Sequence, residues 1–83
     1  MDEKEELKQQ LQQELQWVLY RQKMLDIMDE KLLEMKLLTE QAKRGNLSPE
    51  ELEVLNRRLK NLAAQVRAID SESRKTEDGK ILE

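Results

Sequence analysis

The chain has 83 residues, of which 40% are charged, and it carries a net charge of −3 with no Cys and no His. Such a chain holds one small domain at most and cannot contain disulfides or metal sites built from thiolate or imidazole ligands. Its longest uncharged runs are too short to cross a bilayer, and no signal-peptide segment opens it, so we expect a soluble cytoplasmic protein with no membrane partner. The net negative charge disfavours nucleic acid as a partner, but a local basic face could override it, so a weak nucleic-acid-associated protein stays an alternative.

The first predicted element is a long helix over about 3–44. Asp2 and Glu3 lie where the positive end of the helix dipole favours anions, and Lys43 and Arg44 lie at the opposite end, where cations are favoured. Gly45 can take the left-handed conformation that commonly follows the last helical residue. Neither Gly nor Pro interrupts the stretch between.

A turn over 45–48 leads to a second helix over about 49–70. Ser48 and Glu51 have the spacing of a capping box, Pro49 suits the first helical position, and Leu47 and Leu52 can form a hydrophobic staple. Because the connection is short, the two helices are expected to be antiparallel. We therefore predict an all-α fold, an antiparallel two-helix hairpin of coiled-coil type over 1–74, followed by a flexible polar tail over 75–83.

The second helix carries one narrow apolar stripe with spacings of three and four residues. This pattern is a heptad seam that suits a single neighbouring helix. Its members are Leu52, Leu55, Leu59, Leu62, Val66 and Ile69.

The first helix is apolar over a wider arc. Leu11, Val18, Leu25 and Leu32 recur every seven residues, and we expect this set, completed by Met28 and Met35, to face the second helix. A second set lies well to one side of the first and consists of Trp17, Tyr20, Met24 and Ile27. A helix with so wide an apolar surface is expected to have more than one neighbour.

The predicted lengths give a separate reason to expect association. At 1.5 Å per residue the first helix spans about 63 Å and the second about 32–39 Å. Nothing in the second helix then covers Leu7, Leu11 or Leu15, and each exposed side chain forfeits about 1.5–3 kcal/mol. We predict a homodimer or higher oligomer built as a four-helix bundle, with a helical protein as a further possible partner. The predicted interface residues are Leu7, Leu11, Leu15, Trp17, Val18, Tyr20, Met24 and Ile27.

Several features admit a functional and a plainer interpretation. The three methionines Met24, Met28 and Met35 suit either an adaptable binding groove or gap-filling in the hairpin seam. The basic residues of the second helix, and an acidic ridge on the first, suit either a ligand site or a solvated face. Those residues are Arg57, Arg58, Lys60 and Arg67, and Asp26, Asp29, Glu30 and Glu34. Without a catalytic or phosphate-binding motif, we expect no enzymatic activity, no cofactor and no metal.

One stretch suggests an alternative function. Asp29-Glu30-Lys31-Leu32-Leu33 resembles the first helix of the small all-helical chorismate mutases, a likeness confined to these residues. It implies an enzyme that holds a dicarboxylate with cationic side chains, of which Arg21 would be one. Where that family would offer a further Arg, this sequence has Thr39. A second possibility, the hairpin phosphatases of sporulation response regulators, is weakened because residues 55–60 lack their Ser-Gln-x-x-x-Asp signature.

Overall fold

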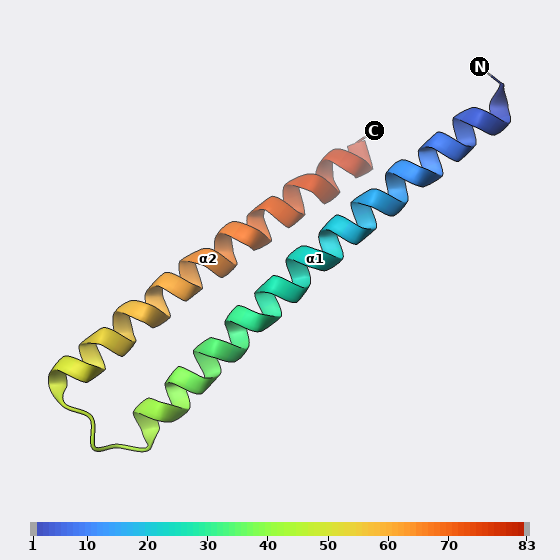
Figure 1. The fold of residues 1–83 in the computed structure, drawn as a ribbon. Coiled ribbons are helices and arrows are strands. Elements are labelled where there is room, and N and C mark those ends of the chain that lie inside the picture. The colour runs from blue at the N-terminus through green and yellow to red at the C-terminus, as the bar shows by residue number, and fades with distance from the viewer. Residues whose placement is uncertain (1, 83) are drawn as a thin grey trace.

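The computed structural model describes the backbone of residues 2–82 and the side chains of residues 2–74. Two helices, α1 (Glu3–Lys43) and α2 (Pro49–Leu82), make up this part of the chain, and no strand occurs in it. They run antiparallel and side by side, joined at one end by a short turn (Figure 1). The molecule is a rod of 68 × 17 × 12 Å. The predicted all-α helical hairpin is confirmed.

The helix ends form as the sequence indicates. The backbone N–H of Glu5 donates to the Asp2 carboxylate at 2.8 Å, which caps α1. At the start of α2 the Glu51 N–H donates to Ser48 Oγ at 3.1 Å, and the Ser48 N–H donates back to Glu51 Oε1 at 3.5 Å. These reciprocal bonds are the expected capping box. Gly45 has φ of 81° and takes the left-handed conformation after α1.

The second helix extends further than the sequence pattern suggested. It continues to Leu82, past the predicted end near residue 70. The backbone of 75–82, predicted as part of a flexible tail, therefore belongs to α2, and the side chains of Ile81 and Leu82 lie outside the described residues. At 1.5 Å per residue, α2 is about 51 Å long and α1 about 61 Å, so α1 exceeds α2 by about 10 Å. Figure 1 shows the N-terminal end of α1 projecting beyond α2.

The hairpin core is a single seam, and α1 contributes a different stripe from the one expected. On α2 the predicted seam holds from Leu55 onward and continues to Ser73, which is 4% exposed. On α1 the side chains facing α2 recur at spacings of four and three, and all are buried or half-buried. They are Trp17, Arg21, Met24, Met28, Lys31, Met35, Leu38 and Ala42.

The expectation that Val18, Leu25 and Leu32 face α2 is wrong. Each is exposed, by 46%, 42% and 50%. Each also follows a residue of the actual seam by one position, and one residue turns a helix by about 100°. Trp17, Met24 and Lys31 are those preceding residues. The stripe predicted to be internal is thus the neighbouring face of α1.

Polar side chains sit within and beside the seam. Lys31 Nζ donates to Gln65 Oε1 at 2.5 Å across the helices. The ammonium group of Lys31, half-buried in the seam, thus has an acceptor on the opposite helix. Arg58 of α2 forms an ion pair with Glu34 of α1 on one flank of the helix contact. The basic side of α2 is therefore not wholly solvated.

Candidate interaction surface

Half of the large apolar side chains that the structure describes are exposed, and few are buried. Among the described residues only Met24, Met28 and Leu62 are buried apolar side chains. The accessible surface is 7132 Å². A compact monomer of 9.9 kDa exposes about 5,200 Å², so this chain carries an excess of about 1,900 Å². The exposed large apolar residues are Leu7, Leu11, Leu15, Val18, Leu19, Tyr20, Leu25, Leu32, Leu33, Leu37, Leu52 and Val54.

One group of exposed side chains forms a second heptad stripe on α1, which we name the outer face. It consists of Leu11, Leu15, Val18, Leu25 and Leu32, and the intervening heptad positions are Gln22 and Asp29. The outer face lies about 100° around α1 from the seam that contacts α2. Its spacings of four and three residues are those that pack against another helix.

The N-terminal end of the outer face adjoins the segment of α1 that projects. Leu7, Leu11 and Leu15 are 56–58% exposed. They line a shallow groove, of about 440 Å³, that is predominantly apolar and is bordered by Lys4 and Lys8. This groove begins in the projecting segment of α1 and continues toward Leu15.

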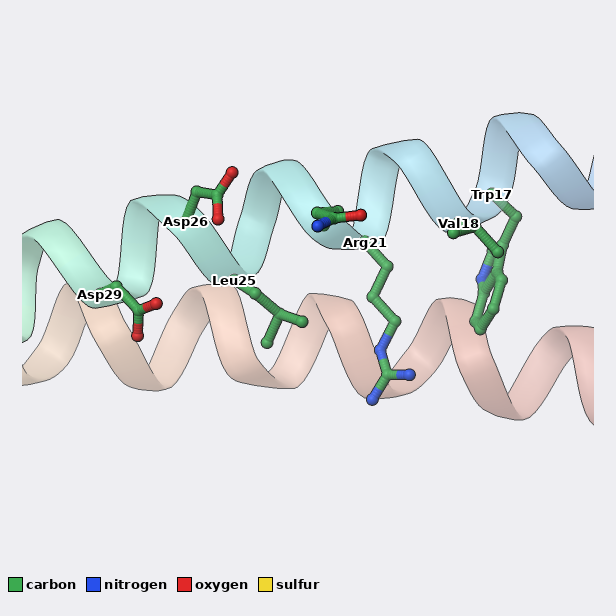
Figure 2. A pocket seen from close by; sticks show the side chains of 7 residues that line it. Trp17, Val18, Arg21, Leu25, Asp26 and Asp29 are labelled. Atoms are coloured by element: carbon green, nitrogen blue, oxygen red, sulfur yellow. The ribbon is translucent and has the colours of Figure 1, made fainter.

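Further along, the outer face borders a pocket of about 340 Å³ beside Trp17 and Arg21. Figure 2 shows the Trp17 ring and the Arg21 side chain both extending toward α2, with Asp26 and Asp29 at the far end of the pocket. The Arg21 guanidinium lies 5.7 Å from the centre of the Trp17 ring, a cation–π arrangement. The Trp17 Nε1 is buried and donates no hydrogen bond to any described residue, which costs about 1–3 kcal/mol.

The structure divides the residues predicted for the interface into three groups. Leu7, Leu11, Leu15, Val18 and Tyr20 are exposed and available to a partner. Trp17 and Ile27 are half-buried beside α2. Met24 is 6% exposed in the hairpin seam, so it is absent from the surface.

Sequence reasoning had assigned Leu25 and Leu32 to the hairpin seam, whereas they belong to the exposed outer face. Polar residues account for the misassignment. Arg21 and Lys31 interrupt the true seam, and this obscures its seven-residue period in the sequence. The signal that could have separated the stripes is the seven-residue spacing of Trp17, Met24 and Leu38, in which Lys31 is the one polar member.

The second helix has no equivalent outer stripe. The residues of α2 that flank the outer face along the hairpin are Asn56, Ala63 and Asp70, of which only Ala63 is apolar. Apart from its seam, the described part of α2 exposes two large apolar side chains, Leu52 and Val54. A helix that docks on this side therefore finds its apolar contacts on α1.

The alternative catalytic interpretation required Arg21, Arg57 or Arg67 in a shared cavity. Arg57 and Arg67 are exposed on α2. Arg21 is half-buried and lines the pocket of Figure 2, but Asp26 and Asp29 line it too, which weakens it as a site for an anion. Among the described residues, no three acidic side chains gather closely enough to hold a metal ion. The described helices also contain no stretch apolar and long enough to cross a bilayer.

The geometry of the chain thus has to be interpreted from its own residues. Comparison with protein-family models, with curated proteins and with solved structures finds no match to this chain.

Proposed function

We propose that this chain is a non-catalytic helical interaction module that self-associates and offers the assembled helices to a helical protein partner. The observation that carries the proposal is the ratio of exposed to buried apolar side chains, with three buried against twelve large ones exposed among the described residues. A rod with one seam has too little core to be stable alone. Its composition, 40% charged residues, suits an aqueous, cytoplasmic setting.

The mechanism we propose is the packing of helices into apolar grooves. Each Leu of the projecting segment gains about 1.5–3 kcal/mol when it is covered. The interfaces of obligate homodimers bury about 2,000–5,000 Å² in total, and the excess surface of two copies falls in that range. A symmetric dimer is the simplest assembly that covers the same face on both copies. We propose that such a dimer forms first and that helical partners bind to it.

The test is to replace Leu11 and Leu15 with Glu together and to measure the molar mass by light scattering. We expect the oligomer to dissociate, because two carboxylates per chain would have to be buried at the interface. The matched control is Gln9→Glu with Gln16→Glu, which adds the same charge at exposed positions away from the outer face. An oligomer that survives Leu11→Glu with Leu15→Glu, or a wild-type chain that is monomeric with both helices formed, would contradict the proposal.

A further inference from the structure

The outer face suggests a specific partner and orientation, on the basis of the self-association proposed above. We propose that a second copy of this chain covers the outer face, with the two α1 helices antiparallel. In this arrangement Lys4 and Lys8 of each copy lie over Asp26 and Asp29 of the other. Each α2 remains at the periphery, bound only to its own α1.

The distribution of apolar side chains determines which helices meet. The outer face supplies Leu or Val at most heptad positions between Leu11 and Leu32. The flanking side of α2 supplies Asn56, Ala63 and Asp70. A contact between two α1 helices therefore brings apolar side chains together at its centre, whereas a contact between α1 and a second α2 places Leu against carboxylate and amide groups.

The charges along the outer face determine the orientation. The stripe continues through Lys4 and Lys8 at one end and through Asp29 in its second half. In a parallel, in-register pair each of these residues meets its own counterpart, so Lys faces Lys and Asp29 faces Asp29, which is repulsive. All of these charged side chains are exposed, and none forms an ion pair with a described residue of its own chain.

An antiparallel pair converts these repulsions into attractions. When Lys4 of one copy lies opposite Asp29 of the other, the heptad spacing places Leu15 opposite Val18 and Leu11 opposite Gln22. Lys8 then lies opposite Leu25. Its aliphatic stem can cover that Leu while its ammonium group reaches Asp26 or Asp29. The two-fold axis generates every contact twice.

The area involved is sufficient for a stable dimer. The overlap runs from Lys4 to Asp29 and is about 39 Å long at 1.5 Å per residue. A standard interface buries about 800 Å² per partner. The chain's excess surface of about 1,900 Å² exceeds that requirement. The overlap includes the projecting segment that α2 of the same chain leaves uncovered.

Charge reversal tests the pairing. The variant Lys4→Glu with Lys8→Glu should raise the dimer dissociation constant by about tenfold or more. At each end of the dimer the two new carboxylates would face Asp26 and Asp29 of the other copy, so the attractions there become repulsions. Adding Asp26→Lys with Asp29→Lys to the same chain should restore the wild-type constant. In a parallel dimer, reversal at Lys4 and Lys8 only exchanges one like-charge pair for another. An unchanged constant for the first variant, or a failure of the second to restore it, overturns the antiparallel pairing.

A distance measurement separates the orientation from the association itself. Because the chain has no Cys, Glu30→Cys places a single spin label on an exposed site away from the outer face. The proposed register separates the two labels by about 40 Å along the helix axis, whereas a parallel dimer holds them within about 20 Å. Gln16→Cys is the control, since it lies near the two-fold axis and yields a short distance in either orientation.

The outcomes distinguish the two proposals. A long Glu30→Cys distance together with a short Gln16→Cys distance supports the antiparallel dimer. Short distances at both sites overturn the orientation but leave self-association intact. No interaction at either site, with a monomeric mass, overturns both.

Discussion

A few side chains stabilise the hairpin. Met24, Met28 and Leu62 are the buried apolar residues of the described chain, and Leu62 is the one that α2 contributes. The apolar seam also tolerates Lys31 because Gln65 accepts its hydrogen bond. Such a pair adds little to stability. At the scale of residues, the fold therefore depends on a seam with few buried side chains, and each substitution there should lower the stability strongly.

Leu62→Ala should lower the free energy of unfolding by about 2–3 kcal/mol, since it removes buried methyl groups and leaves a cavity. The matched control on the same helix is Val54→Ala, because Val54 is 54% exposed and its replacement should cost less than about 1 kcal/mol. Urea unfolding at one protein concentration measures both variants. Equal losses for the two would contradict the assignment of Leu62 to the core.

At the scale of elements, each helix is defined by its ends and by its stripes. The Ser48 capping box starts α2, and Asp2 caps α1. The two helices differ in how much of their circumference is apolar. One stripe of α2 meets α1, whereas α1 carries one stripe for α2 and a second, the outer face, that its own chain leaves uncovered.

Ser48→Ala should destabilise the protein by about 1 kcal/mol, because the Glu51 N–H loses its side-chain acceptor. That loss corresponds to a fall of about 4–8 °C in the thermal midpoint of a chain of this size. Ser48→Asp should retain most of the stability, as Asp is also a good cap. As a contrast, Ser71→Ala in the exposed middle of α2 should leave the midpoint unchanged or raise it, through helix propensity. The midpoints are measured by circular dichroism.

At the scale of the whole molecule, the rod shape is the basis of the proposed self-association. A radius of gyration of 19.6 Å compares with about 12 Å for a compact domain of this length. In the proposed assembly other chains cover much of this apolar surface, and folding and assembly would then be coupled. The outer face and the projecting end of α1 are continuous, which allows one partner helix to cover both.

Coupling of folding to assembly predicts that stability depends on concentration. For a dimer that unfolds to two monomers, a tenfold increase in protein concentration should raise the thermal midpoint by about 4 °C. A monomeric hairpin would have the same midpoint at every concentration. Thermal scans of the wild-type chain over a hundredfold range distinguish the two, and the Leu11→Glu with Leu15→Glu variant should lose the dependence.

The amino-acid sequence by itself determined the two helices, the turn between them, the capping box and the seam from Leu55 to Ile69. These features follow from local rules, because caps, left-handed Gly and heptad spacing act within a few residues. The excess of apolar surface on α1 was also evident from composition and spacing. The end of α2 was not evident from the sequence, because its last turns are mostly polar and show no apolar period.

Only the tertiary structure decided which stripe of α1 faces α2. The two candidate stripes are offset by one residue, and the one with Val18, Leu25 and Leu32 is left outside. The inner stripe includes Arg21, which lies over the Trp17 ring, and Lys31, whose ammonium group donates to Gln65 of α2. Pairwise satisfaction of that kind depends on both helices at once, and no pattern within α1 alone can reveal it.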